Sequence, residues 1–298
     1  MAHVPVLLQE TITGLSLQSG DTVVDCTLNR GGHSKLMAEA IGPTGHLIGI
    51  DADAEAIAEA KINLRVVKAK LSFAVSNFRQ LDRVLADLGV GKVDAFLFDL
   101  GLSSDQLDLS RRGFSFSHGN QPLLMSFDSK ETPGRLTAYE IVNQWREESL
   151  ADIIYGYGEE HFSRRIASGI VEARKLKPIA TTDELVEVIR QAVPIWYTNK
   201  RLHFATKTFQ ALRITVNDEL GAIKEALTKA WSHLKPNGRI AVISFHSLEA
   251  RLVKNQFKSW VADGEGELVT KKVVKPSRAE EVANPRSRSA QLKIIKKI

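Results

Sequence analysis

Three aspartates occupy equivalent places in the sequence, because each directly follows a short apolar run. Asp25, Asp51 and Asp99 end the runs that start at Thr22, His46 and Val93. Such runs, separated by helical segments, are typical of parallel strands that are buried on both faces of a sheet. The carboxyl ends of parallel strands meet at one edge, so the three carboxylates are expected to line one polar crevice. One acid there could be only a helix cap; three in register favour a ligand site.

The loop between the first predicted strand and the first predicted helix, residues 25–34, reads Asp-Cys-Thr-Leu-Asn-Arg-Gly-Gly-His-Ser. It lacks the G-x-G-x-x-G fingerprint that brings backbone amides to the pyrophosphate of a dinucleotide, which weakens a nucleotide-dependent oxidoreductase as an interpretation. Gly31 and Gly32 carry no Cβ, so the main chain there can lie against a ligand without a phosphate. S-adenosylmethionine is such a ligand. A simple turn is the structural alternative for this pair of glycines.

Two further positions suit a nucleoside at the same edge. Asp51 is placed to accept both ribose hydroxyls, and Phe78, after a predicted third strand at 71–75, could lie against an adenine ring. Taken singly, Asp51 could be a helix cap and Phe78 a core residue. Together at successive strand ends they favour a nucleoside-type cofactor.

The order of predicted elements indicates an α/β fold interrupted by helices. Strands alternate with helices up to Asp99, residues from about 110 to 205 show only helical patterning, and a late apolar strand follows at 239–245, with a last one expected at 292–295. Thr181 and Glu184 have the spacing of a capping box. The predicted helices cover 34–41, 54–63, 81–88, 138–145, 151–157, 159–174 and 184–193, with a long helical region at 206–234. The expected domains are an α/β domain made of residues 1–109 and 206–298, and a helical insertion at 110–205 that recognises the substrate.

Composition places the chain among ordinary globular proteins, with 43% hydrophobic and 25% charged residues. The single cysteine, the lack of a basic, apolar leader and the absence of an apolar run of about 20 residues together predict a cytoplasmic protein that does not enter a membrane. From Arg251 to the end, 12 Lys/Arg stand against five Asp/Glu, so the rest of the chain has a net charge of −2. A phosphate-rich partner would select such a basic segment, although a merely solvated end has the same composition.

Several long motifs resemble those of the bacterial 16S ribosomal RNA cytosine-N4 methyltransferase family, the MraW-type enzymes. They run in order through nearly the whole chain. The motifs lie at 3–8 (HVPVLL), 30–34 (RGGHS), 99–108 (DLGLSSDQLD), 112–116 (RGFSF), 157–160 (YGEE), 205–213 (ATKTFQALR), 242–249 (VISFHSLE) and 284–290 (NPRSRSA).

The resemblance implies a Rossmann-like domain that uses S-adenosylmethionine, interrupted by a helical insertion. It also implies a target cytidine in the decoding region of the small-subunit RNA, with 16S RNA or the small ribosomal subunit as partner. The cofactor contacts that it implies are Gly31, Gly32, His33, Asp51, Phe78, Asp99 and Gln106. The oligomeric state stays open, with a homodimer as one option.

Methyl transfer to an exocyclic amine needs a hydrogen-bond acceptor beside the amine, because the nitrogen lone pair is delocalised into the ring. We expect Asp99 to contact the cofactor or this amine, with Ser103 and Ser104 as nearby hydrogen-bonding groups; each of the three could instead be a cap. Arg213 and His246 are further candidates for the substrate. The lone Cys26 is a poor candidate for the covalent nucleophile of C5 methylation, and no close-spaced set of ligands predicts a metal site. Plausible phosphate contacts are Arg111, Arg112, Arg164, Arg165, Lys207, Arg213, Arg286 and Arg288.

The chain departs from the family pattern at four places. Leu124 and Ser126 stand where relatives carry an acid and an arginine, and Ala250 replaces an aspartate. Asn29 replaces a glycine, which a turn with positive φ tolerates. The loss of charge at Leu124 and Ser126 motivates an alternative function, a non-catalytic ribosome-assembly factor that keeps the methyltransferase fold and binds ribosomal RNA.

Overall fold

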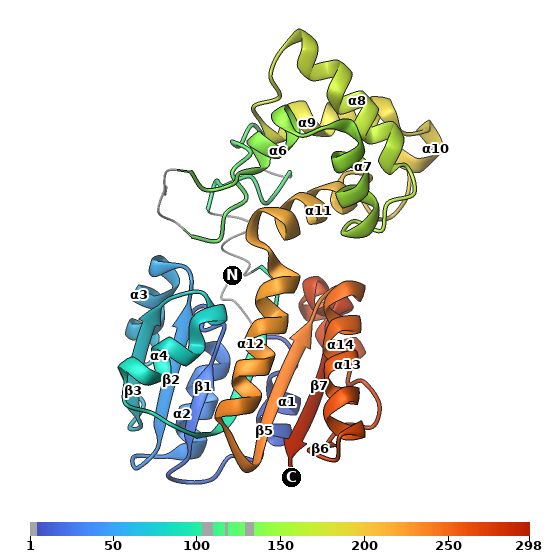
Figure 1. Cartoon of the computed structure of the whole chain (residues 1–298). Coiled ribbons are helices and arrows are strands. Elements are labelled where there is room, and N and C mark those ends of the chain that lie inside the picture. Colours follow the sequence, from blue (N-terminus) through green and yellow to red (C-terminus); the bar gives the residue numbers. More distant parts are fainter. Residues whose placement is uncertain (1–4, 103–109, 117–118, 129–133) are drawn as a thin grey trace. The chain divides into compact units, whose positions relative to one another are not determined.

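The computed structural model describes residues 5–102, 110–116, 119–128 and 134–298. The chain divides into two compact units, which are considered separately below (Figure 1). Unit 1 comprises Met1–Gly101 and Leu220–Ile298, and unit 2 comprises Leu102–Glu219.

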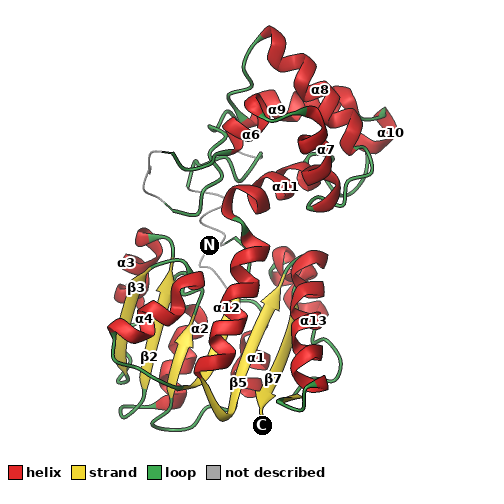
Figure 2. Cartoon of the chain, viewed as in Figure 1, coloured by secondary structure: helices red, strands yellow, loops and turns green. Residues whose placement is uncertain are grey.

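Unit 1 is built on a seven-stranded sheet in the order β3-β2-β1-β4-β5-β7-β6 (Figure 2). β1 to β5 pair in parallel, whereas β7 runs antiparallel to both of its neighbours, β5 and β6. The strands are β1 (Thr22–Asp25), β2 (His46–Asp51), β3 (Lys70–Val75), β4 (Val93–Asp99), β5 (Leu234–Ser244), β6 (Gly266–Leu268) and β7 (Gln291–Lys297).

Helices cover both faces of the sheet because alternate strand residues point to opposite sides. Val24 and Phe96 enter a core shared with α4, α12 and α13, while Val23 and Leu97 enter a core shared with α1, α2 and α3. The helices of this unit are α1 (Leu8–Leu15), α2 (Gly32–Ile41), α3 (Ala54–Asn63), α4 (Leu81–Asp87), α12 (Glu219–His233), α13 (Ser247–Ala262) and α14 (Arg278–Ala283), with short 3-10 turns at Phe78–Gln80 and Pro285–Ser289.

The strand order reverses between β1 and β4, since β2 and β3 lie on one side of β1 and β4 and β5 on the other. In open α/β sheets this reversal opens a crevice beyond the carboxyl ends of the two strands, which is where ligands bind. β1 ends at Asp25 and β4 at Asp99. The topology thus brings to one crevice two acids that are far apart in the sequence.

The predicted α/β fold class is confirmed, and the helix at 54–63 has the bounds that the sequence predicted. Among the described residues the structure adds four helices that the sequence analysis did not predict, α1, α13 and the shorter α10 (Ile195–Thr198) and α14. The sequence does carry a signal for α13, because His246 and Glu249 form a capping box at its start. The expected helical region 206–234 is two helices, since Asp218 adopts a left-handed conformation with φ 45° and interrupts it.

Unit 2 is helical in the part that the structure describes. Its helices enclose one apolar core, to which Ile141, Ile166 and Leu212 contribute from three different helices. They are α6 (Ala138–Gln144), α7 (Glu147–Gly156), α8 (Ser163–Leu176), α9 (Thr182–Ala192), α10 (Ile195–Thr198) and α11 (Thr206–Asn217). The unit is longer than the insertion expected at 110–205, because α11 packs on α6 and α7.

A capping box starts α9, as the sequence predicted. The backbone N–H of Glu184 donates to the hydroxyl of Thr181 at 3.4 Å, and the N–H of Thr181 donates to the Glu184 carboxylate at 3.1 Å. The carboxylate also accepts from the Ala180 N–H and pairs with Lys177, and together these contacts lower the pKa of Glu184 to about 2.

Thr181→Ala should destabilise the first turn of α9 by ~1 kcal/mol, because an N–H at the helix start loses its acceptor. Amide hydrogen exchange at Glu184 measures this locally, which suits a chain of two units better than one global unfolding curve. Thr181→Ser keeps the hydroxyl and is the control. Equal exchange in the alanine and serine variants would contradict the assigned cap.

Candidate active site

The three predicted acids meet at the carboxyl edge of the sheet. Asp25 is 1% exposed and Asp51 is 8% exposed, while the side chain of Asp99 is 11% exposed. Burial of carboxyl groups disfavours their charged form, and nearby carboxylates add to this effect. Accordingly, the pKa of each of the three acids is raised, chiefly by burial.

Asp25 ties the end of β1 to the start of α2. One carboxylate oxygen accepts the N–H of Thr27 at 3.1 Å, and the other accepts the hydroxyl of Ser34 at 2.7 Å. Burial raises its pKa to about 6 against the lowering effect of these hydrogen bonds, with a further contribution from Asp51. Asp25 therefore shapes the loop and contributes negative charge to the crevice.

Asp51 at the end of β2 has the acceptor capacity that a ribose requires. Its two oxygens accept backbone N–H groups from Asn29 at 2.8 Å and Asp53 at 2.9 Å. A carboxylate offers about four acceptor positions, so these two bonds do not exhaust it. Burial raises the pKa of Asp51 to about 6.

Asp99 and His33 form a pair within unit 1. His33 Nε2 lies 3.0 Å from the Val6 carbonyl and its Nδ1 lies 3.5 Å from Asp99 Oδ2. A carbonyl oxygen can only accept a hydrogen bond, so Nε2 of His33 carries a proton. The other ring nitrogen, Nδ1, is the one that faces Asp99. The other oxygen, Asp99 Oδ1, is buried without a hydrogen-bond partner among the described residues. Burial raises the pKa of Asp99 well above its usual value, with Asp25 and Glu249 adding to the shift.

The fold of unit 1 itself favours glycine at positions 31 and 32 of the loop, apart from any ligand. Gly31 has φ +79° and is the N-cap of α2, a conformation that residues with a Cβ rarely adopt. A Cβ on Gly32 would lie 2.3 Å from the ring of Pro5. Asn29 has φ 47°, as its replacement of glycine predicted. The expected contact of Gly31 and Gly32 with a cofactor stays a prediction.

Phe78 is partly buried at the margin of the core. Its ring meets the ring of Phe98 edge-on, with centroids 5.9 Å apart. Phe78 is therefore anchored by β4 while part of its ring stays accessible. Its contact with adenine stays a prediction.

The structure describes only some of the remaining predicted site residues. Ser103, Ser104 and Gln106 lie outside the described residues. Arg213 is largely buried and pairs with Glu219 through two hydrogen bonds of 2.8 and 3.0 Å. This fork gives Arg213 a structural role, and its contact with a substrate stays a prediction.

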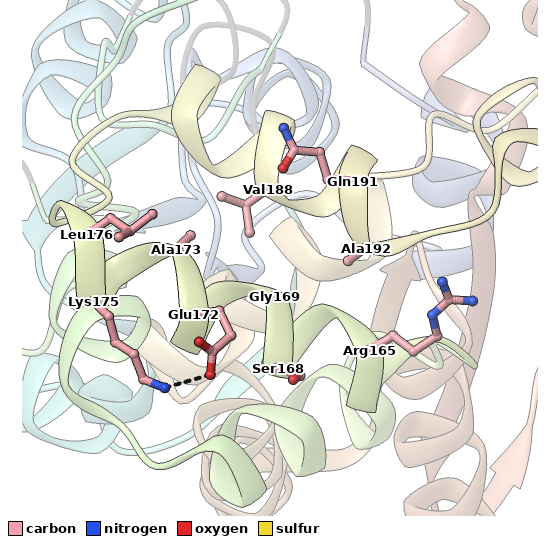
Figure 3. Close-up of a pocket in the computed structure, with 10 residues that line it drawn as sticks. All are labelled: Arg165, Ser168, Gly169, Glu172, Ala173, Lys175, Leu176, Val188, Gln191 and Ala192. Carbon is pink, nitrogen blue, oxygen red and sulfur yellow. Dashed lines mark hydrogen bonds and ion pairs between the residues drawn. The ribbon is translucent and has the colours of Figure 1, made fainter.

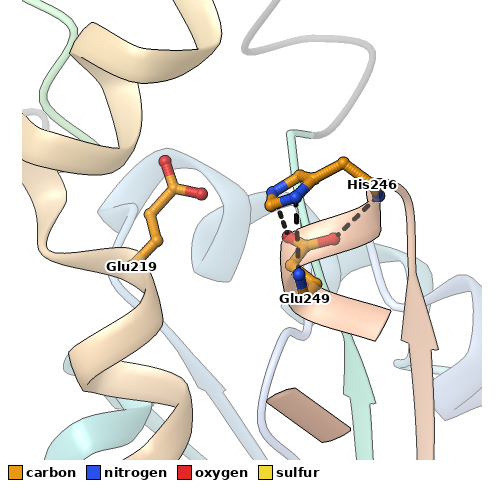
Figure 4. A group of neighbouring side chains, drawn as sticks. All are labelled: Glu219, His246 and Glu249. Carbon is orange, nitrogen blue, oxygen red and sulfur yellow. Dashed lines mark hydrogen bonds and ion pairs between the residues drawn. The ribbon is translucent and has the colours of Figure 1, made fainter. Parts of the chain in front are cut away.

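His246 caps α13 (Figure 4). Its Nδ1 accepts the N–H of Glu249 at 3.4 Å, while the Glu249 carboxylate accepts the N–H groups of Phe245 and His246. An accepting Nδ1 carries no proton, so the proton of the neutral ring is on Nε2, 3.2 Å from the same carboxylate. His246 therefore has a structural role as the N-cap of α13, and its contact with a substrate stays a prediction.

Three residues of the site were missed by the reasoning from sequence. Thr27 Oγ1 accepts the backbone N–H of Asp99 at 2.6 Å and so joins the ends of β1 and β4. Val6 fixes the ring of His33, and Pro5 packs on Gly32. The motif at residues 3–8 was the available signal, because it includes both Pro5 and Val6.

A groove of about 690 Å³ lies between α8 and α9 of unit 2 (Figure 3). Its lining includes Arg165, Glu172 and Lys175, and Glu172 pairs with Lys175 at 2.6 Å. Among the described residues only one of the two cations forms an ion pair, and the groove lies open on the surface with no buried titratable group in its lining. The sheet edge, with its buried and mutually repelling acids, is the better candidate for chemistry.

The crevice fits S-adenosylmethionine better than it fits a dinucleotide. Burial raises the pKa of all three acids, Asp51 adds to the raised pKa of Asp25, and Asp25 adds to that of Asp99, so the edge favours a cation and repels a pyrophosphate. A sulfonium nucleoside combines positive charge with ribose hydroxyls that Asp51 can accept. Fold and site together define a doubly wound α/β protein with a site for a cationic nucleoside.

The chain belongs to the MraW methylase family, which it matches over residues 1–298. It is 43% identical to a protein of Brevibacillus brevis over 311 residues, covering 99% of this chain and 98% of the relative. It is also 42% identical to a protein of Paenibacillus sp. over 317 residues, covering 99% of each. Both relatives carry the name "Ribosomal RNA small subunit methyltransferase H". The resemblance predicted from the motifs is confirmed.

Two solved structures are similar over the full chain at low sequence identity. One is a protein of Clostridium thermocellum, 13% identical, with a TM-score of 0.47 and full coverage of both chains. The other is a protein of Streptococcus mutans in complex with SAH, 10% identical, with a TM-score of 0.48 and 99% coverage of each.

Membership of this methylase family confirms S-adenosylmethionine as the predicted cofactor. Within the residues that the structure describes, no helix has the length and apolar character needed to cross a bilayer.

Asp51→Ala should weaken binding of S-adenosylmethionine by ~1–3 kcal/mol, because the ribose hydroxyls lose a buried acceptor. Isothermal titration calorimetry measures the affinity. Asp53→Ala is a suitable control, since Asp53 caps α3 from the same loop. An unchanged affinity in Asp51→Ala would refute the placement of the ribose.

Cofactor affinity should also fall as the pH is lowered from about 7 to about 5. In the free protein the pKa of Asp51 is about 6, whereas hydrogen bonds from a ribose favour the carboxylate and lower the pKa in the complex. Binding is therefore full above the free-state pKa and weakens below it. Conversely, the stability of the free protein falls as the pH rises from 3.8 to about 6, because the unfolded chain loses this proton first.

Calorimetry across this pH range checks the dependence, with Asp51→Asn as the control. Asp25 has a similar pKa, so the variant should flatten the dependence without abolishing it. A wild-type affinity that is constant from about pH 5 to 7 would contradict this linkage.

Proposed function

We propose that the protein transfers a methyl group from S-adenosylmethionine to the exocyclic N4 of a cytidine in the decoding region of 16S ribosomal RNA. The names of the curated relatives support a small-subunit ribosomal RNA as substrate. The resemblance of the sequence motifs to the cytosine-N4 enzymes supports the finer assignment. The basic segment from Arg251 onward is consistent with contact to phosphates.

The observation that carries the choice of an amine target is the environment of Asp99. Its Oδ1 is buried and without a hydrogen-bond partner among the described residues, at the strand end where the sheet order reverses. A buried acceptor left unpaired is costly, so it favours a ligand that brings an N–H. The N4 amine of cytosine has two such hydrogens.

S-adenosylmethionine, when bound, supplies an electrophilic methyl group. Asp99 accepts a hydrogen bond from the target amine and so localises the nitrogen lone pair for attack. When the amine becomes cationic, Asp99 Oδ1 takes its proton, which a carboxylate of raised pKa does more readily than an ordinary one. His33 acts on Asp99 Oδ2 and orients the carboxylate, since its own ring is fixed by the Val6 carbonyl.

The remaining roles follow from the family resemblance and from position. We assign the cofactor to Gly31, Gly32, His33, Asp51, Phe78 and Gln106, and we assign Asp99 to the target amine, the second of the two contacts expected for it. Substrate contacts are assigned to Ser103, Ser104, Arg213 and His246, and recognition of the RNA to the helical insertion. The α/β domain of residues 1–109 and 206–298 carries the reaction.

The two departures that motivated a non-catalytic assembly factor lie in a segment held by main-chain contacts. The carbonyl of Leu124 accepts the N–H of Ala138, and Arg112 donates to the carbonyls of Ser126 and Phe127. Residues of any type provide such carbonyls, so the changes at Leu124 and Ser126 leave this fold intact. The structure therefore gives no independent support to the assembly factor, which remains as an outcome of the test below.

Incubation with labelled S-adenosylmethionine and immature small ribosomal subunits should yield N4-methylcytidine in nuclease digests. Asp99→Asn should lower kcat by about two orders of magnitude, because an amide of the same shape cannot take the proton. The affinity for the cofactor should change little.

Label at another position of cytosine would overturn the N4 assignment. Absence of transfer with normal cofactor binding would indicate the assembly factor. If Asp99→Asn loses cofactor affinity and keeps kcat, Asp99 contacts the cofactor and not the amine. Cys26→Ala is the control, since the proposed reaction needs no thiol and kcat should be preserved.

A further inference from the structure

An aromatic cluster in unit 2 takes no part in the site described above. Phe162, at the start of α8, meets Trp196 at 6.0 Å and Tyr197 at 4.9 Å between ring centroids, both edge-on. Trp196 and Tyr197 are themselves edge-on at 5.8 Å. We call these three rings the aromatic platform; Trp196 and Tyr197 belong to α10 (Figure 1).

A buried carboxylate fixes the position of two rings of the aromatic platform. The hydroxyl of Tyr197 donates to Glu160, which also accepts the N–H of Phe162 and is 0% exposed. Burial and this carboxylate raise the pKa of Tyr197, so its hydroxyl remains a donor. Glu160 therefore fixes two of the three rings without presenting negative charge to the solvent.

One ring of the aromatic platform, that of Trp196, is largely exposed to solvent. Trp196 is 59% exposed and its neighbour Ile195 is 83% exposed. Trp145, Trp231 and Trp260 are more buried, and the last two are each 7% exposed. Large exposed aromatic rings are unfavourable in water and mark surfaces that have a partner.

Cations surround the rings. Lys200 Nζ lies 4.8 Å from the ring centre of Trp196 and 5.0 Å from that of Tyr197, and the guanidinium of Arg165 lies 5.9 Å from that of Phe162. Arg201 follows directly and is exposed. The sequence from 188 to 217, which contains α10, has five Lys/Arg and no Asp or Glu.

We infer that the aromatic platform, with Arg165, Lys200 and Arg201, binds a single-stranded segment of the ribosomal RNA substrate by stacking a base on Trp196 and pairing cations with phosphates. Stacking on an exposed ring beside cations is how single strands are bound without sequence readout. The inference rests on the proposed function for the identity of the RNA.

The charge pattern favours RNA over the other partners of an exposed aromatic surface. Lysine is depleted at the core of protein interfaces, whereas Lys200 lies over the rings themselves. A membrane surface would need a long amphipathic face, whereas α10 has four residues. A phosphate backbone matches both the cations and the lack of acids.

Stacking can be observed directly through Trp196. A short single-stranded RNA oligonucleotide should quench the tryptophan fluorescence of the full-length protein, and Trp196→Phe should remove most of this quenching. Oligonucleotide that leaves the fluorescence unchanged, or quenches both proteins equally, would overturn the inference.

Trp196→Ala should raise KM for immature small subunits about tenfold, because one stacked base is lost. The cofactor Kd and kcat should stay as in the wild type, and Trp196→Phe should lie between. Tyr155→Ala is the matched control, since Tyr155 is 63% exposed in the same unit but lies one helical turn from Asp152. If Trp196→Ala leaves KM unchanged while the wild type methylates normally, the proposed RNA contact of the aromatic platform is refuted.

The cations have a separate readout. For Lys200→Gln and Arg201→Gln, the slope of log affinity for the oligonucleotide against log salt should each become shallower by about 0.7. Lys175→Gln, whose lysine pairs with Glu172, should keep the slope. Slopes that do not change would overturn the phosphate contacts.

The fluorescence and salt-dependence measurements use an oligonucleotide and need no methyl transfer, so they test this inference separately from the proposed function. Normal quenching without methylation would leave the platform supported and the proposed reaction refuted. Binding to ribosomal proteins or to anionic vesicles, with no response to the RNA oligonucleotide, would instead identify a different partner and overturn the inference.

Discussion

The parallel pairing of β1 with β4 is the contact on which the site depends. It places Asp25 opposite Leu97, two residues before Asp99, although these segments are separated by two strands and three helices along the chain. The ladder continues past the end of β1 through the hydroxyl of Thr27, which accepts the N–H of Asp99. Because the strand order reverses here, the two acids lie at the place where open α/β sheets bind ligands.

Burying carboxyl groups together is unfavourable, and the local structure offsets only part of the penalty. Asp25 and Asp51 each accept two hydrogen bonds, yet the pKa of each is raised to about 6. Asp99 has an oxygen with no hydrogen-bond partner among the described residues. A fold that retains such groups gains stability when a cationic ligand with N–H and O–H donors binds. The unfavourable electrostatics of the free protein therefore favour the bound state.

The exposed surface of the aromatic platform in unit 2 carries the opposite charge. A fully buried carboxylate near the aromatic platform, Glu160, is satisfied by Tyr197 and Phe162, and the surface above it carries Lys200 and Arg201. Acids are thus kept where a cationic cofactor is expected, and cations where a phosphate chain is expected.

The sequence by itself determined the alternation of strands and helices, the three strand-end acids, the helical insertion and the capping box of α9. These are local patterns, since periodicity, end signals and apolar runs are read within one element. The family motifs identified the cofactor. They did so without showing the reason for each residue: Gly32 is required by Pro5, and His246 caps a helix that the sequence analysis did not predict.

Only the tertiary structure decided which groups meet. Thr27 with Asp99, Val6 with His33, and Phe162 with Trp196 are contacts between residues that are distant in sequence. So is the extent of unit 2, because α11 continues the helical pattern of α12 and only packing assigns it to α6 and α7. The pKa values of the acids also depend on burial, a property of the whole fold. Composition and spacing give the type of a side chain, and the pairing of distant strands and helices gives its neighbours, its exposure and therefore its chemistry.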